Sequence, residues 1–420
     1  MYEEQSRYSG TYSDSSTVTV SPMELAELLQ SNRSTSEYHY YWTSPIADVA
    51  PQSTMSREFN WFNQLQTNRP LEILDPRGPS LWMGTSGSGT QCHYDVADNV
   101  IVQLYGTKRI RIYPPIVGVF HLHVFPDAHP KARKSQVDFD FFNISNDNDG
   151  DVIENADMLR RYPHFTTVPN PTMDVILQPG DALQIPAFWF HHVENGTLPR
   201  KYNSEDATIC GGGGTFGYDD SHQPSVSLNS FALSESMMIA RRIFQLASRP
   251  LGGKRSVSSP NVVLGDGSME NASSILRALG IALICGLKVV NYDEEVGFIR
   301  TYLLEARYSP LLHHRTDSTT ANHNISCEQM RNSTNTRPSS LTSEQQHTVN
   351  VCIDRILPDF RLLELSCGEE EVAQQHKSRG ETSDANGIKL LVALHLLELW
   401  AVELVGPKLV AEAWELALSS

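Results

Sequence analysis

The 420-residue sequence lacks an excess of basic residues: 33 Lys and Arg stand against 49 Asp and Glu, a formal net charge of −16. Binding to nucleic acid through charge needs a basic surface, so this balance argues against a nucleic-acid partner. Residues 1–6 also lack the basic and apolar segments of a secretion signal. We therefore expect a protein of the cytoplasm or the nucleus.

Paired cysteines and long uncharged apolar runs are also missing. The six cysteines are scattered without a CxxC pair, which predicts reduced thiols and argues against a disulfide framework. The two most apolar segments, 275–290 and 390–405, contain charged side chains such as Arg277 and Glu398. We therefore expect no membrane-spanning helix and no membrane partner.

Short strand-like runs separated by turns dominate the chain between about residues 38 and 232. In the segment 99–113, for example, Gly106 and Thr107 form a two-residue turn between two such runs. Another apolar run, predicted as one strand, covers residues 182–193. Many short strands with close turns are typical of a double-sheet jelly roll, the fold of cupins. The predicted fold is therefore mainly β, a double-stranded β-helix.

The character of the sequence changes near residue 233, where helical spacing of apolar residues begins. Helices are predicted at 234–248, 272–290, 294–308, 349–356 and 388–418, the last broken at Gly406 and Pro407. The predicted domains are a flexible leader at 1–20, a β domain at 21–232 that opens with a helical lead-in, and a helical region at 233–420 with a polar linker at about 309–345. The acidic segment 146–151 is predicted to be a solvated loop, because Ala156 stands where a calcium loop needs a carboxylate.

One His and one Asp stand two residues apart on a predicted strand, at His93 and Asp95. Side chains alternate along a strand, so these two project to the same side. They would supply two of the three ligands of an iron(II) site that has two His and one carboxylate. A later strand carries His191 and His192, of which at most one can face the first pair. The pattern predicts a metal site whose third ligand is one of these two.

Further motifs follow in a fixed order along the chain. They are His93-Tyr94-Asp95, Asn99, Gly106-Thr107-Lys108-Arg109, Tyr113-Pro114-Pro115, Pro179-Gly180-Asp181, and the segment from Ile185 to His191. In this order they resemble the JmjC/cupin-8 family of iron(II)- and 2-oxoglutarate-dependent dioxygenases. The resemblance covers roughly residues 20–232. Within the family, the chain looks most like the asparaginyl hydroxylase that inhibits hypoxia-inducible factor, through residues 59–61 and 135–139. It is also similar to the tRNA wybutosine-synthesising hydroxylase, through residues 81–84.

The resemblance implies a role for each matching residue. Iron(II) would be bound by His93, Asp95 and His191, which leaves His192 as a surface or supporting residue. The far carboxylate of 2-oxoglutarate would pair with Lys108, since a carboxylate in an apolar barrel needs a cation. The remaining matches to cosubstrate-binding positions are Thr90, Tyr40, Asn99 and Asn229. Two departures from the family pattern are a Gly-rich insertion at 195–224 and Trp42, which stands where the asparaginyl hydroxylase has a polar residue.

The activity that the resemblance implies is hydroxylation of a protein side chain. Iron(II), 2-oxoglutarate and O2 would take part, and succinate and CO2 would be released. The alternatives are hydroxylation of a modified tRNA base, demethylation of methyl-lysine, and a cupin-fold binding or scaffold protein without activity. A degenerate scaffold is expected to lose a metal ligand or the cosubstrate lysine, and this chain keeps all four. The apolar stripes at 390–399 and 409–418 suit either core packing or a homodimer interface.

Overall fold

The computed structural model describes residues 2–6, 17–18, 38–49, 79–137, 139, 160–196, 224–251, 269–289, 294–308, 311, 341–368 and 381–419. The chain forms two compact units. The first comprises Met1–Tyr113, Asp138–Asp147 and Asn170–Ser234, and the second comprises Pro114–Val137, Asn148–Pro169 and Glu235–Ser420. The change of unit after Ser234 lies close to the predicted end of the β domain, but the second unit also includes two earlier segments. The predicted lead-in helix, the acidic segment 146–151, and most of the 195–224 insertion and the 309–345 linker lie outside the described residues.

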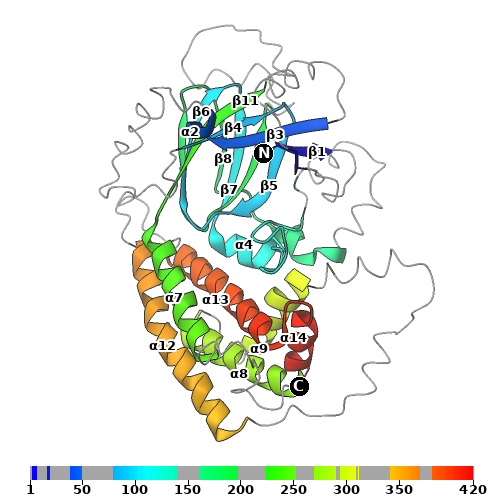
Figure 1. Ribbon diagram of the computed structural model, residues 1–420, viewed down its shortest axis with the longest axis vertical. Helices are drawn as coiled ribbons and strands as arrows, with labels where there is room; N and C mark the ends of the chain where they lie inside the picture. The colour runs from blue at the N-terminus through cyan, green and yellow to red at the C-terminus, as the bar shows by residue number, and fades with distance from the viewer. Residues whose placement is uncertain are drawn as a thin grey trace, which may run out of the picture. The chain divides into compact units, whose positions relative to one another are not determined.

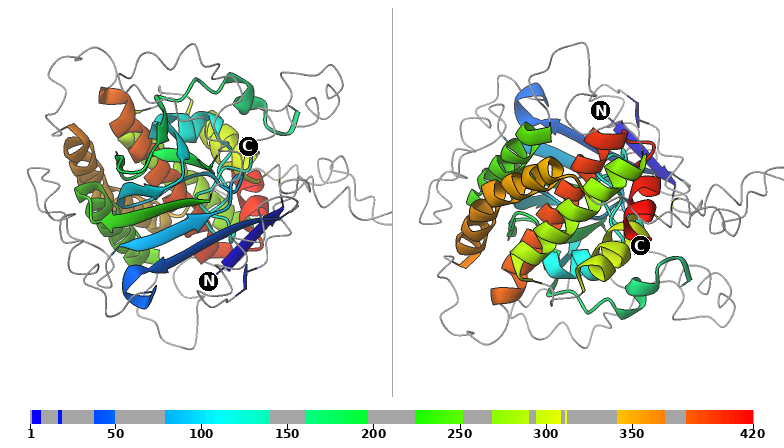
Figure 2. Two further views of the ribbon diagram at one scale, coloured as in Figure 1. Left: turned by 90° about the horizontal axis from the view of Figure 1, so that it is seen from above. Right: turned by 90° about the horizontal axis from the view of Figure 1, so that it is seen from below.

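Two antiparallel β-sheets make up the first unit, as the predicted jelly-roll fold requires (Figure 1). The seven-stranded sheet has the order β2-β1-β3-β4-β11-β6-β9, and the four-stranded sheet has the order β5-β10-β7-β8. The left view of Figure 2 shows the strands lying side by side. Their bounds are β1 Tyr2–Ser6, β2 Thr17–Val18, β3 Tyr38–Pro45, β4 Ser80–Gly84, β5 Gly89–Tyr94, β6 Asp98–Tyr105, β7 Lys108–Tyr113, β8 Met173–Leu177, β9 Ala182–Ile185, β10 Phe190–Asn195 and β11 Ser225–Ala232, with the short helix α2 Ile46–Val49 after β3.

The prediction of a single strand over residues 182–193 is wrong, because this segment forms two strands in different sheets. β9 pairs with β6 in the seven-stranded sheet, whereas β10 lies between β5 and β7 in the four-stranded sheet. Pro186 has no N–H for a strand ladder. Phe188 adopts a left-handed backbone conformation with φ 68°. The break between the two strands carries the chain from one sheet to the other.

The predicted flexible leader is wrong for residues 2–6 and 17–18. β1 pairs with β3, and β2 pairs with β1, so both extend the edge of the seven-stranded sheet. Polar composition alone hides this pairing, because adding a strand to a sheet edge uses backbone groups whatever the side chains are.

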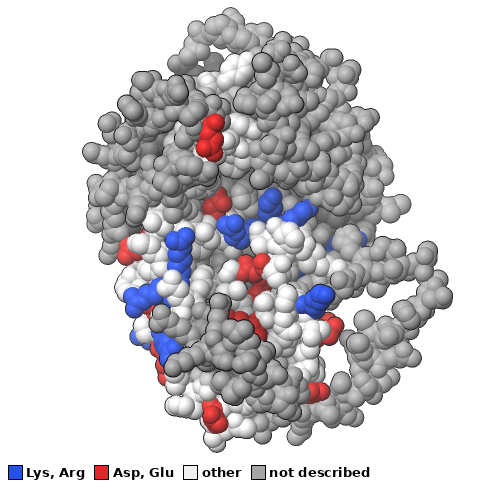
Figure 3. Space-filling model, in the orientation of Figure 1, with Lys and Arg blue, Asp and Glu red and all other residues white. Residues whose placement is uncertain are grey.

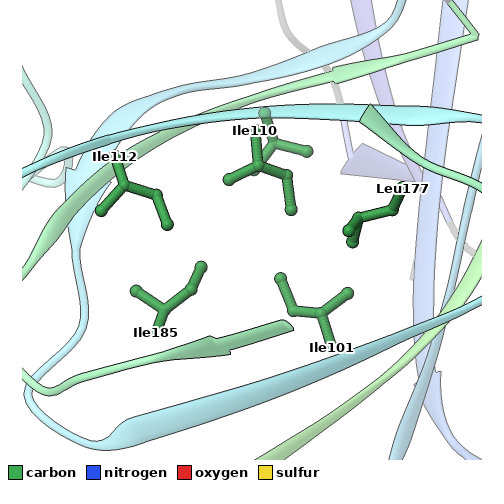
Figure 4. Close-up of a cluster of buried hydrophobic side chains, with 6 residues drawn as sticks. Ile101, Ile110, Ile112, Leu177 and Ile185 are labelled. Atoms are coloured by element: carbon green, nitrogen blue, oxygen red, sulfur yellow. The ribbon is translucent and has the colours of Figure 1, made fainter. Parts of the chain in front are cut away.

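Branched aliphatic side chains fill the space between the two sheets of the first unit. Figure 4 shows Ile101 and Ile185 from the seven-stranded sheet pointing toward Ile110 and Ile112 from the four-stranded sheet. Each such side chain contributes about 1.5–3 kcal/mol by leaving water. The inner face of each sheet is therefore defined as the face that carries this cluster, whose members are Ile101, Ile110, Ile112, Leu177, Ile185 and Val193.

Helices dominate the described part of the second unit, and the right view of Figure 2 shows several of them side by side. The two last predicted helices are separated near Gly406, whose φ of 80° suits glycine. The helix predicted at 349–356 is much longer, and it begins inside the predicted linker. The bounds are α4 Pro115–His121, η3 Pro163–Thr167, α7 Glu235–Leu251, α8 Met269–Leu287, α9 Glu295–Phe298, the π-helix η6 Ile299–Tyr308, α12 Ser343–Gly368, α13 Glu381–Val405 and α14 Val410–Leu418.

Helix α8 is long and apolar enough to cross a membrane by length and composition. The sequence analysis expected no helix with these properties. It has 19 residues, and its most apolar window has a mean hydropathy of 1.3. Within the second unit 56% of that window is buried, and Leu276 and Leu283 are fully buried. A core helix of a water-soluble domain has the same properties, so α8 alone is weak support for a membrane span.

Acidic and basic side chains of the described residues are interspersed on the face of the molecule shown in Figure 3. In the full sequence acidic residues outnumber basic ones by 49 to 33, and Figure 3 shows no large patch of one sign among the described residues on this face.

Candidate metal centre and cosubstrate pocket

Three potential metal ligands come together on the inner face of the four-stranded sheet. One ligand atom each from His93, Asp95 and His191 lies within 4.8 Å of the other two. His93 on β5 and His191 on β10 are direct cross-strand partners, and their ring centroids are 4.3 Å apart. The Nε2 atom of His191 is 3.7 Å from an Oδ atom of Asp95. Of the two adjacent histidines, it is thus His191 that the structure brings to the first pair.

Hydrogen bonds to the backbone orient both histidine rings. The Nδ1 atom of His93 is 2.9 Å from the carbonyl oxygen of Gln91, and that of His191 is 3.2 Å from the carbonyl oxygen of Trp189. An Nδ1–H that donates to a carbonyl leaves the Nε2 lone pair as the metal ligand. Burial lowers the pKa of His191, although the nearby Asp95 carboxylate raises it. Burial is the larger of the two effects, so the net shift favours the neutral imidazole that can bind a cation.

The turn before β10 is bonded to the segment that carries the carboxylate ligand. The backbone N–H of Phe188 donates to the carbonyl oxygen of Asp95 at 2.7 Å. The N–H of Ala187 donates to the Asp98 carboxylate at 2.8 Å. These two bonds connect the chain before His191 to the chain around Asp95 and so help to set the spacing of the three ligands.

A β-bulge in β5 places Thr90 on the same face as the metal ligands. His93 is opposite His191 and Thr90 is opposite Val193, with a register shift between these two pairs. Two residues of β5 therefore stand across from the single residue His192. Without this bulge Thr90, three positions before His93, would face the other way. The bulge supplies the geometry that a cosubstrate role of Thr90 requires.

His192 lies on the outer face of the four-stranded sheet, and the expectation of a surface position is wrong. Its side chain is 1% exposed, and its Nε2 atom is 3.3 Å from the Glu194 carboxylate. Glu194 also accepts a hydrogen bond of 2.5 Å from Arg111, and Phe139 stacks on the His192 ring. Burial would raise the pKa of Glu194, but His192, Arg111 and Arg109 together lower it well below its usual range. His192 belongs to a buried ionic cluster and not to the metal centre.

Lys108 is buried on the inner face, and its ammonium group has no carboxylate partner among the described residues. Its relative exposure is 3%, and its Nζ atom donates a hydrogen bond of 2.6 Å to the Oγ of Ser227. Burial lowers the pKa of Lys108 to about 7. On β7 the residue opposite His191 is Ile112. Lys108 lies four positions before Ile112, so its backbone is roughly 13 Å along the strand from the level of His191. A buried cation therefore faces the same interior as the metal ligands, a short distance away.

Asn99 and Asn229 also lie inside the first unit, where the resemblance implies cosubstrate contacts. Their side chains are 3% and 8% exposed. The Nδ2 of Asn229 donates to the Oδ1 of Asn99 at 3.4 Å, and the Oγ of Ser227 donates to the Oδ1 of Asn229 at 3.3 Å. The two asparagines and Lys108 are thus connected through Ser227, a residue that the motifs did not indicate. Ser227 lies two positions before Asn229 on the same strand, so the two side chains face the same side. This spacing is the sequence signal that could have pointed to Ser227.

The seven-stranded sheet adds two aromatic residues to this interior that the sequence analysis did not assign to the site. The register puts Trp82 opposite Ser227 and Thr43, and Tyr41 opposite Gly84, all on the inner face. The rings of Tyr41 and Trp82 have centroids 5.4 Å apart. Tyr41 is therefore the tyrosine of β3 that the structure shows on the inner face, while the side chain of Tyr40 lies outside the described residues.

The residues present fit iron(II) and 2-oxoglutarate. Two imidazoles and one carboxylate are the donor set of non-haem iron(II) oxygenases and leave coordination positions open. The buried N–H of Trp82 has no hydrogen-bond partner among the described residues. Leaving such a donor unsatisfied costs about 1–3 kcal/mol. Trp82 and Lys108 both neighbour Ser227, through the β4–β11 register and a hydrogen bond, so both donors are available on the inner face to an acidic ligand.

Comparison with known families agrees with this geometry. The profile of the cupin-like domain matches residues 8–229, more than half of the chain. The chain belongs to the JmjC/cupin family. The matched region contains every site residue named above, from Tyr41 on β3 to Asn229 on β11.

Curated relatives match over a shorter region. The chain is 31% identical over 117 residues to HSPB1-associated protein 1 of Homo sapiens, which is 28% of this chain and 20% of that protein. It is 38% identical over 100 residues to tRNA wybutosine-synthesizing protein 5 of Danio rerio, 24% of each chain. It is 30% identical over 118 residues to Lysine-specific demethylase JMJ30 of Arabidopsis thaliana, 28% of this chain and 23% of that protein. These matches thus span only about a fifth to a quarter of each relative's length.

Proposed function

We propose that this JmjC/cupin-family member is an iron(II)- and 2-oxoglutarate-dependent dioxygenase that hydroxylates a protein side chain. The observation that carries the proposal is the position of Lys108, a buried cation without a described anion, on the inner face that also holds His93, Asp95 and His191. A protein pays for such a buried charge only where something compensates it, and a dicarboxylate bound to the metal does so.

Each residue then has a definite task. His93, Asp95 and His191 hold iron(II) through two Nε2 atoms and a carboxylate oxygen. When bound, the iron with 2-oxoglutarate and O2 supplies the oxidation, which yields succinate, CO2 and a hydroxylated substrate. Lys108 binds the far carboxylate, and Thr90, Asn99 and Asn229 orient the rest of the cosubstrate. The aliphatic cluster packs between the sheets beside these residues and limits the access of water to them.

The decisive experiment is succinate release from 2-oxoglutarate after anaerobic loading with iron(II). We expect release by the wild type and its loss in His93→Ala and Lys108→Ala. Lys408→Ala is the matched control, because Lys408 is an exposed lysine of the second unit. Failure of the wild type to bind iron(II) or to turn over 2-oxoglutarate with any substrate fraction would overturn the enzyme proposal in favour of a cupin-fold binding protein.

The substrate class needs a separate test, because relatives whose names refer to tRNA wybutosine synthesis and to lysine demethylation share 38% and 30% identity with the matched segments. Cell extract is divided into a protein fraction and a tRNA fraction, and each is added to the loaded enzyme. A protein side-chain hydroxylase is stimulated by the first fraction, with a mass gain of one oxygen atom. Stimulation by tRNA that ribonuclease abolishes, or loss of a methyl group from lysine, would replace the substrate proposed here.

A further inference from the structure

Ser227 connects the two sheets at the point where the proposed cosubstrate pocket ends. It is fully buried on β11 of the seven-stranded sheet, and its Oγ accepts the 2.6 Å hydrogen bond from Lys108 on β7 of the four-stranded sheet. No other described acceptor receives a hydrogen bond from the Lys108 ammonium. The direction of this ammonium is thus set from the opposite sheet by one hydroxyl.

The same hydroxyl begins a line of hydrogen bonds with a single direction. Ser227 donates to the Oδ1 of Asn229, and the Nδ2 of Asn229 donates to the Oδ1 of Asn99. A hydroxyl has one hydrogen and two lone pairs, so accepting from Lys108 leaves its hydrogen for Asn229. Each amide is therefore held with its oxygen toward Ser227, and the Nδ2 of Asn99 is left to donate. Asn99 lies at the start of β6, next to Asp98, which binds the turn before the metal ligand His191.

We propose that Ser227 is a positioning residue for the cosubstrate, which fixes the Lys108 ammonium at one end of the pocket and the Asn229 and Asn99 amides toward the other. This inference rests on the proposed function. It predicts that both ends of 2-oxoglutarate are held less well when the hydroxyl is removed, even though Ser227 itself touches neither the metal nor the reacting atoms.

The chain offers a matched control on the same strand. Ser225 is also fully buried on the inner face of β11, but its Oγ accepts a hydrogen bond of 3.0 Å from Gln103 and none from Lys108. Ser227→Ala and Ser225→Ala therefore remove the same group from equivalent depths. Ser227→Thr restores a hydroxyl at the position in question.

The measurement is calorimetric titration of the full chain with 2-oxoglutarate after loading with cobalt(II), which requires no turnover. Ser227→Ala is expected to bind 2-oxoglutarate about tenfold more weakly, the effect of one net hydrogen bond to a charged group. Its cobalt(II) affinity should equal that of Ser225→Ala, and Ser227→Thr should recover most of the lost affinity for 2-oxoglutarate. Adding Lys108→Met to Ser227→Ala should cost no more than Lys108→Met alone.

The outcomes separate the two proposals. Wild-type binding of 2-oxoglutarate with equal binding by Ser227→Ala would overturn the role of Ser227 and leave the proposed function standing. Equal weakening by Ser225→Ala and Ser227→Ala would also overturn it, because the effect would then be one of packing. No binding of 2-oxoglutarate by the cobalt(II)-loaded wild type would instead overturn the proposed function, and the inference with it.

Discussion

His93 and His191 lie directly opposite each other on β5 and β10, and each ring is held by the carbonyl oxygen of the residue two positions earlier in the chain. The same local bond thus orients both imidazoles, with 2.9 Å from Nδ1 to Gln91 and 3.2 Å from Nδ1 to Trp189. Because each bond is made to a residue two positions earlier in the chain, pairing of β5 with β10 is sufficient to present two Nε2 atoms to one point. The carboxylate of Asp95 completes the group.

The first prediction separates the two adjacent histidines. His191→Ala should weaken cobalt(II) or iron(II) binding by more than about 100-fold, since it removes a direct ligand. His192→Ala should change metal affinity by less than about tenfold, because its ring faces the opposite side of the sheet and pairs with Glu194. Anaerobic metal titration followed by calorimetry measures both. Equal loss of metal from the two variants would contradict the assignment of His191.

The second prediction concerns the pH dependence of stability. Burial lowers the pKa of Lys108 from 10.5 to about 7. Between these values the unfolded chain binds a proton that the folded chain does not. Stability without cosubstrate should therefore rise with pH from about 7 to 10.5, by up to about 5 kcal/mol from this residue. Below pH 7 both states are protonated, and the full cost of the buried charge remains.

Denaturant unfolding at pH 7 and pH 10 tests this dependence in the wild type and in Lys108→Met. The difference in unfolding free energy between the two proteins should favour Lys108→Met at pH 7 and shrink at pH 10. Saturating 2-oxoglutarate with cobalt(II) should remove most of the difference at pH 7, because the ligand supplies the missing anion. A difference that stays constant with pH would show that Lys108 is not held in a buried, ligand-free state.

The third prediction concerns a buried ion pair inside the second unit. Glu398 of α13 is 1% exposed, accepts a hydrogen bond of 3.0 Å from Arg307, and accepts one of 2.6 Å from the backbone N–H of Asp127. Burial raises the pKa of Glu398, while Arg307 lowers it. Arg307→Met leaves the carboxylate without its cation and should destabilise the protein by about 3–5 kcal/mol. Adding Glu398→Gln removes the charge but keeps an acceptor for Asp127, so the double variant should regain stability in thermal unfolding. A double variant less stable than Arg307→Met would contradict this explanation.

The fourth prediction uses two glycines with opposite surroundings. A Cβ at Gly387 of α13 would lie 2.3 Å from the backbone nitrogen of Ile116 and 2.8 Å from the carbonyl carbon of Pro115. Gly387→Ala should destabilise the protein by about 1–3 kcal/mol, despite the better helix propensity of alanine. Gly297→Ala in α9 is the control, because nothing lies within 4 Å of its Cβ. It should leave the melting temperature unchanged or raise it, and a fall as large as that of Gly387→Ala would contradict the packing argument.

Local periodicity was sufficient to predict much of the site. Alternation along a strand puts His93 and Asp95 on one face, and the turn at Gly106 places Lys108 at the start of the next strand. Strand β7 coincides with the run predicted after the turn at Gly106 and Thr107, because turn residues on its N-terminal side set where it begins. The resemblance then supplied the third ligand and the cosubstrate residues, whose roles remain predictions.

Long-range pairing decided the rest. The choice of His191 over His192 follows from the pairing of β10 with β5, and the inward position of Thr90 follows from a bulge that exists only in that pairing. The break at Pro186, which sends β9 and β10 to different sheets, and the link from Lys108 to Ser227 also depend on residues far apart in the chain. A sequence pattern reports which way a side chain points along its own strand. Which strand stands opposite, and in what register, is determined by the packing of the whole sheet.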